Sequence, residues 1–139
     1  KGHTPMTAAT NYLESNLCDH AMGKTSYTKP TTTYIALSTA DPTETGSQSN
    51  EPSGNGYTRQ DASTAFGAAN ATTGTAVNTS VITFGPCVTS GWGTITHALY
   101  CDASTTGNGL IYLALTASRT IAVGDSLQFA TSQLSVTFS

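Results

Sequence analysis

The chain has 139 residues, a length that fits one domain, and only 9% of them are charged, against about 25% in an ordinary globular domain. Lysine and arginine total 5 against 8 acids, and the net charge of −3 excludes the phosphate neutralisation that nucleic-acid binding depends on. No apolar run approaches the roughly 18 residues of a membrane-spanning helix, and 27 threonines, 15 serines and 13 glycines favour strands and turns.

Residues 6–23 carry the one helical pattern, and residues 1–5 ahead of them match no element and are treated as a flexible leader. Apolar side chains recur three and four positions apart, as on one face of a helix. The polar face has no cluster of lysine or arginine, which argues against a helix lying on a membrane. We expect a short helix docked on a sheet. If it docks on a neighbouring molecule instead, its apolar anchors are Tyr12, Leu13 and Leu17.

The ends of this helix carry capping residues. Thr10 or Asn11 is the expected N-cap, with Thr7 as an earlier option, because short polar side chains accept hydrogen bonds from the first turn. Gly23 suits the C-terminal end, because glycine tolerates a left-handed conformation, and Lys24 follows near the negative end of the helix dipole.

Residues 31–139 alternate in the period of β-strands. The alternating segments recur about every 8–12 residues and are joined by polar turns, which is typical of a β-sandwich or jelly roll. The sequence therefore predicts a single, mainly β domain with about seven or eight antiparallel strands and one short N-terminal helix. The expected strand segments are 32–39, 56–60, 77–84, 92–101, 110–116, 127–129 and 134–138.

Three of these regions allow more specific expectations. Alternation along 92–101 places Ile95, His97 and Leu99 on one face of a strand. Residues 110–116 are apolar on both faces, as in a central strand. Residues 41–55, rich in proline, glycine, serine and glutamate, form a long loop, and loops of this length are usually functional or mobile.

The cysteines allow one disulfide at most within the chain. Cys18 is expected to be a small buried residue of the helix. Cys87 and Cys101 lie at or near neighbouring strands, so a disulfide between them is one alternative. No CxxC spacing occurs, and the three histidines lack metal-ligand spacing, so we expect neither a metal nor a cofactor.

Catalytic motifs are weak in this sequence. The simplest interpretation of His97 is a hydrogen-bonded core or interface residue. A third hypothesis for the function is a small hydrolase that uses His97, but the sequence contains no G-x-S-x-G motif to support it. The 8 acids form no paired-carboxylate motif. Asn70 and Asn78 each begin an N-x-S/T sequence, which chance explains in a chain so rich in threonine.

Trp92 stands between two glycines and allows two interpretations. Aromatic residues flanked by glycine can form sugar-stacking platforms or interface anchors. In that glycan-binding reading, Asp102, Asn108 or Asn55 would bind the sugar hydroxyls. The simpler reading is an aromatic residue that closes one end of a sandwich core, and the exposure of Trp92 discriminates between the two.

Five segments, covering most of the chain from residue 11 on, carry a resemblance to a known family: NYLESNLCDHAMGK at 11–24, TYIALSTADPT at 33–43, GYTRQ at 56–60, WGTITHALYCDAS at 92–104 and GNGLIYLALTASRTIAVGDSLQFA at 107–130. Their order and spacing resemble those of small tailed-bacteriophage virion proteins, of the tail-fibre-like or head-decoration-like kind. Cys87 and Cys101 depart from the family's pattern of apolar or small residues, and the residues before Met6 are extra.

The resemblance implies a non-enzymatic structural protein of the virion, assembled in the host cytoplasm. It is expected to be a capsid decoration or cement protein, or a tail or fibre component. The implied partners are major capsid or tail proteins and further copies of the chain in a dimer or trimer, with no nucleic acid and no membrane. Loop 41–55 and the helix are the expected contact segments. Interface candidates are Tyr12, Leu13, Leu17, Trp92 and the two arginines, Arg59 and Arg119.

Overall fold

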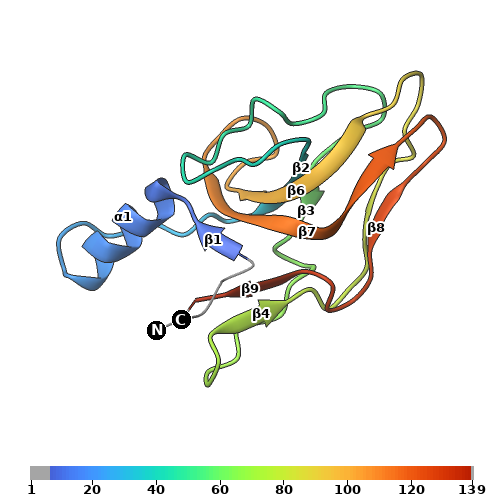
Figure 1. Cartoon of the computed structure of the whole chain (residues 1–139). Coiled ribbons are helices and arrows are strands. Elements are labelled where there is room, and N and C mark those ends of the chain that lie inside the picture. The colour runs from blue at the N-terminus through green and yellow to red at the C-terminus, as the bar shows by residue number, and fades with distance from the viewer. Residues whose placement is uncertain (1–6, 139) are drawn as a thin grey trace.

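The structure is a computed structural model that describes residues 7–138. Within this range the chain is mainly β, with antiparallel sheets and one short helix, as the sequence predicts (Figure 1). The described residues form nine strands instead of the seven or eight expected. In chain order the elements are β1 (Thr7–Ala9), α1 (Asn11–Ala21), β2 (Tyr34–Ser38), β3 (Gln60–Asp61), β4 (Thr75–Val77), β5 (Ile82–Phe84), β6 (Gly93–Cys101), β7 (Gly109–Ile121), β8 (Leu127–Phe129) and β9 (Ser135–Thr137).

The main sheet has five strands in the order β1-β7-β6-β2-β3. β6 lies at its centre and pairs antiparallel with β2 on one side and β7 on the other. Ile35 and Leu37 of β2 are fully buried on one face, while Ala36 between them joins a smaller cluster on the other face. This alternation follows from the two-residue period of a strand and confirms the pattern expected for 32–39.

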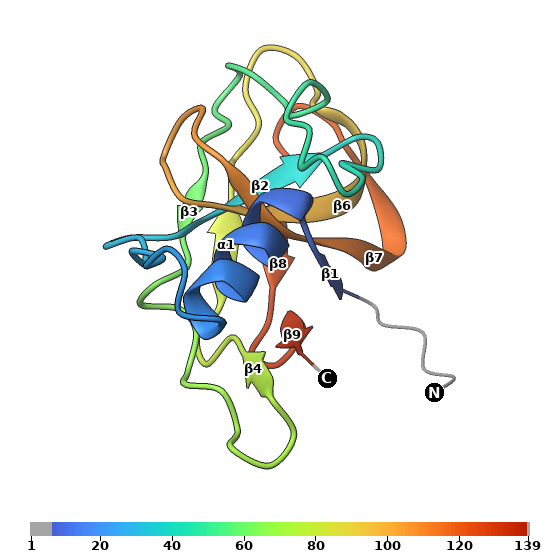
Figure 2. The ribbon, with the colours of Figure 1, turned by 90° about the vertical axis from the view of Figure 1, so that its left-hand side faces the viewer.

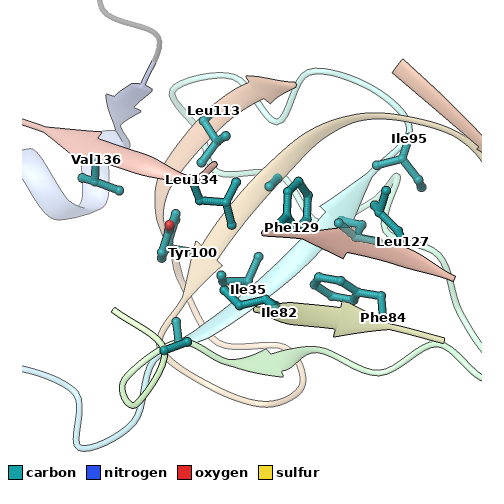
Figure 3. Close-up of a cluster of buried hydrophobic side chains, with 14 of the residues drawn as sticks. Ile35, Ile82, Phe84, Ile95, Tyr100, Leu113, Leu127, Phe129, Leu134 and Val136 are labelled. Carbon is teal, nitrogen blue, oxygen red and sulfur yellow. The ribbon is translucent and has the colours of Figure 1, made fainter. Parts of the chain in front are cut away.

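A second layer covers one face of the main sheet. It is built from two short ladders, β5 with β8 and β4 with β9. Figure 3 shows side chains of both layers meeting in the core, with Ile35 and Ile95 from the main sheet facing Phe84 and Phe129 of the second layer. Phe84 is fully buried, and its ring stands edge-on to that of Phe129 at 6.2 Å between centroids. The arrangement is sandwich-like, and burial of these large side chains is its main source of stability.

The N-terminal segment differs from the predicted helix over 6–23. Residues 7–9 form β1, which pairs with residues 111–113 of β7, and α1 begins only at Asn11. Thr10 is the N-cap: its hydroxyl accepts a hydrogen bond from the Leu13 amide at 3.3 Å and donates to the Gly109 carbonyl at 2.7 Å. The earlier option at Thr7 is therefore wrong, because an open strand edge captures this segment. Within the described residues, no helix has the length and apolar character that a membrane span requires.

An irregularity in the β6–β7 ladder overturns the expected face of β6. Ile95 pairs with Arg119, whereas His97, two residues on, pairs with Ala114. The shift of register turns the strand over. Ile95 lies in the main core with Ala98, while Leu99 belongs to the small cluster on the opposite face. Alternation in the sequence cannot reveal such a bulge, because it counts residues without knowing where the ladder slips.

The long loop 41–55 packs against the sheet instead of hanging free. The Asn11 amide donates to the Glu44 carbonyl at 2.8 Å, and the Thr39 amide donates to the Asn50 carbonyl at 3.0 Å. Gly46 has a φ of +65°, and a Cβ there would meet the Thr10 methyl group at 2.9 Å. Glycine thus permits the close approach of this loop to the start of α1.

Candidate interaction surfaces

Arg59, the residue before β3, is the centre of a buried polar cluster and has a side chain only 2% exposed. Its Nε and Nη2 donate to the two carboxylate oxygens of Glu51 at 2.8 and 2.7 Å. Nη2 also donates to Gln48 Oε1 at 2.7 Å. Nη1 donates to the carbonyls of Ala103 and Thr106 at 2.8 and 2.9 Å. All five N–H groups of the guanidinium are thereby used within the chain.

The Arg59 cluster joins two loops that are distant in sequence. Glu51 and Gln48 belong to loop 41–55, and the two carbonyls belong to the loop 102–108 between β6 and β7. The hydrogen bond to Glu51 raises the pKa of Arg59 above its ordinary value in spite of its burial. The structure gives this arginine a carboxylate partner and two carbonyl partners within the chain. Arg59 therefore has a structural role in joining the two loops.

Trp92 is also an internal residue. It is 5% exposed, its ring stands edge-on to Tyr57 at 5.4 Å, and its Nε1 donates to the Asn55 carbonyl at 3.0 Å. The Tyr57 hydroxyl donates to Glu51 Oε1 and accepts from the Leu37 amide. Burial raises the pKa of Tyr57 far above its ordinary value. A buried indole offers no platform to a sugar, so the interpretation of Trp92 as the end of the core is the one the structure supports.

The polar residues considered for sugar binding lie at the same end of the fold. Asp102 accepts hydrogen bonds from the amide and the side chain of Asn108 at 2.7 and 2.8 Å, and so closes the β6–β7 hairpin loop. Next to it is a groove of about 500 Å³, formed by residues 48–59 and 104–106. Its cationic residue, Arg59, already spends every donor inside the chain. The groove is therefore a polar cleft between two loops, and its charged groups, Arg59 and Glu51, are already hydrogen-bonded to each other.

Helix α1 differs from this polar groove, because it leaves apolar side chains exposed to solvent. Leu13 is 6% exposed and belongs to the main core, so it docks the helix on the chain's own sheet. Tyr12 and Leu17 are 39% and 38% exposed, and Met22 just after the helix is 69% exposed. Figure 1 shows α1 leading away from the main sheet at one end of the molecule, and Figure 2 shows the same helix from that end, in front of the sheet. Of the three predicted anchors, one serves the fold and two remain available for contacts.

His97 has neighbours that explain it without catalysis. Its Nδ1 is 2.8 Å from the Thr96 hydroxyl, and its Nε2 is 3.9 Å from the Asp41 carboxylate, which is largely exposed. His97 and Asp41 form a pair near the surface that joins β6 to loop 41–55. Among residues 7–138, no group of three or more histidine, cysteine, aspartate or glutamate side chains could hold a metal ion.

The cysteines are free thiols in the structure, which corrects two expectations. The suggested disulfide is absent because Cys87 and Cys101 lie in separate clusters on different sides of the main sheet. Cys87 donates to the Ser90 carbonyl at 3.0 Å. Burial raises the pKa of the Cys101 thiol to about 12. Cys18 is exposed, because α1 buries only Leu13 and leaves this position in solvent.

We expect one thiol per native chain to react promptly with an aromatic disulfide reagent at pH 8, and all three to react after unfolding without reductant. The reactive thiol is Cys18, because the other two are buried and Cys101 is protonated at this pH. The control is Cys18→Ser, which should remove the prompt reaction. A count of one thiol in the unfolded, unreduced chain would instead show that the two buried cysteines are linked.

The structure defines a class of protein: a small, mainly β domain whose buried polar groups serve its own loops, and whose projecting helix carries exposed apolar residues. Such exposed apolar residues are typical of protein contacts. The chain belongs to the family of the podophage GP4 fiber I protein gp80, whose family model matches residues 8–137. It is thus a member of a tailed-phage virion family of fibre-like proteins, as the resemblance implied. No curated protein matches the chain significantly.

Proposed function

We propose that this chain is a non-enzymatic structural component of the phage fibre, which acts through contacts with other virion proteins and with further copies of itself in a dimer or trimer. The name of the matching family, a podophage fiber protein, supports the choice of a fibre component in this proposal. The contacts fall on α1 rather than on the loops around Arg59, because those loops satisfy their strongest polar groups internally.

The observation that carries this proposal is the incomplete burial of α1. Leu13, Leu17 and Ala21 are four residues apart and share one face of the helix. Leu13 is buried, Leu17 is 38% exposed and Ala21 is exposed, so the face that docks the helix at its first turn continues uncovered. Only Leu13 is buried in the eleven-residue helix, and isolated helices of this length are marginal in water. A second surface against Leu17 would stabilise α1 and bury this face.

The glycan-binding alternative depended on an exposed Trp92, and this residue is buried. The Asn55 carbonyl accepts its indole N–H, and Asp102 and Asn108 bond to each other.

The solution mass of the purified chain, measured by light scattering over a wide range of concentrations, tests the proposal. We expect a discrete dimer or trimer. Leu17→Glu should raise the concentration needed for association at least tenfold, because the charge loses its hydration in the contact. Val123→Glu is the matched control, because Val123 is 57% exposed and lies in the turn between β7 and β8, away from α1.

Two results would contradict the proposal. One is a native chain that stays monomeric throughout, which together with binding in a sugar screen would favour the glycan alternative. The other is an oligomer whose mass responds equally to both substitutions. Circular dichroism of each variant establishes that its fold is retained.

A further inference from the structure

A groove of about 310 Å³ runs between the second half of β7 and the segment that contains β8 and the start of β9. Figure 1 shows β7 and β8 as neighbouring arms joined by the turn between them. Leu113 and Leu115 of β7 form one wall, and Leu127, Phe129 and Leu134 contribute to the other. Further along β7, Ala117 and Arg119 continue the row of Leu113 and Leu115 but are exposed. The core-facing row of this strand is therefore only partly covered.

Among residues 7–138, the backbone beside this groove is a strand edge that no other strand pairs with. β1 pairs with residues 111–113 of β7, and within residues 7–138 no strand continues along the same edge beyond Leu113. Residues 115–118 are opposite the register shift of β6, and within the described chain no ladder pairs them with another strand. Unpaired N–H and C=O groups on an edge are a template for an added strand. β1 shows that this edge accepts a short antiparallel strand, and the groove continues in line with it.

The charge in the groove distinguishes it from the Arg59 cluster. Arg119 is its charged lining residue, and the polar residues around it are the neutral Gln128, Gln133 and Ser135. Among residues 7–138, Arg119 has no hydrogen bond or ion pair to a side chain, whereas Arg59 uses all its donors. An exposed guanidinium at the end of an apolar groove is suited to bidentate recognition of a carboxylate.

We infer that this groove binds an extended segment of another virion protein, which adds a strand to β7 beyond β1, packs apolar side chains against Leu115 and Phe129, and places a carboxylate on Arg119. The main-chain hydrogen bonds supply affinity, and the apolar wall and Arg119 select the sequence. The inference deepens the proposed function and rests on it, because it specifies one of the contacts that a fibre component makes.

The chain itself offers poor candidates for this place. The sequence KGHTPM ahead of β1 contains no acid, and its Pro5 lacks the N–H that a paired strand donates. A second copy pairing β7 with β7 would supply no carboxylate, because Gly109–Ile121 contains no acid. A segment with an acidic residue from a different protein complements the groove better than either.

A peptide assay tests this inference with the full chain. The probes are two fluorescent six-residue peptides of alternating valine and threonine, with one threonine replaced by glutamate in the first and by glutamine in the second. We expect saturable binding of the glutamate peptide, read as fluorescence anisotropy, with at least tenfold weaker binding of the glutamine peptide. Amide hydrogen exchange should slow in residues 114–120 on binding, because the added strand protects that edge.

Substitutions in the chain separate charge recognition from apolar binding. Arg119→Gln should weaken the glutamate peptide at least tenfold and leave the glutamine peptide unchanged, and Ala117→Trp should abolish both by filling the groove. Leu17→Glu is the matched control and should alter neither, so failure of the α1 contact and failure of this inference give different results. Absence of saturable binding, equal affinity for the two peptides, or protection at β3 instead of β7 would each overturn the inference.

Discussion

Arg59→Ala is expected to lower the free energy of unfolding by about 3–5 kcal/mol, as is typical when one partner of a buried, hydrogen-bonded ion pair is removed. The substitution deletes five hydrogen bonds and leaves the Glu51 carboxylate, whose side chain is 16% exposed, without its cation. The carbonyls of Ala103 and Thr106 lose their donor as well. Urea unfolding followed by circular dichroism measures the loss.

Two variants show whether the loss comes from this geometry. Arg59→Lys keeps the charge but not the planar fork, and should recover less than half of the loss, because one ammonium group cannot reach both loops. Arg119→Ala is the matched control: it removes the chain's other arginine from an exposed position and should change stability by no more than about 0.5 kcal/mol. Equal effects at the two arginines would contradict the structural role assigned to Arg59.

The role of Arg59 in joining two distant loops could not be predicted from the sequence, where arginine stands out only because it is rare. The chain has two arginines, and nothing local in the sequence distinguishes the buried one from the exposed one. Arg59 is buried because two loops, separated by about fifty residues of sequence, meet over it. Such a meeting is a property of the sheet topology, and single-sequence patterns carry no information about it.

The strands were easier to predict where they are long and strongly alternating. β2, β6 and β7 all lie at predicted positions, because β-branched and aromatic residues alternate there on half-buried faces. β1 was missed because Thr7–Ala9 has weak strand propensity and no alternation. Pairing with β7, a tertiary contact, makes it a strand. The same open edge gives rise to the proposed groove, which sequence reasoning likewise could not show.

The two asparagines that begin N-x-S/T sequences have opposite structural roles. Asn78 is fully buried, and its side chain donates to the carbonyls of Ser80 and Ala130 at 2.9 and 2.8 Å. Its Oδ1 accepts from the Leu134 amide at 2.9 Å. One side chain therefore joins the segment between β4 and β5 to the segment between β8 and β9, and holds the second layer together. Asn70 is exposed, and its Oδ1 accepts from two amides of its own turn.

Asn78→Ala is therefore expected to cost about 3–5 kcal/mol of unfolding free energy, because one buried and two part-buried hydrogen bonds to backbone groups are lost, at roughly 1–3 kcal/mol for each group left without a partner. Asn70→Ala, the matched control, should cost no more than about 1 kcal/mol, because water replaces the lost hydrogen bonds of an exposed turn. Urea unfolding of both variants gives the comparison. If the two losses were equal, the second layer would not depend on this residue, and the apolar contacts of Phe84 and Phe129 alone would have to hold it on the main sheet.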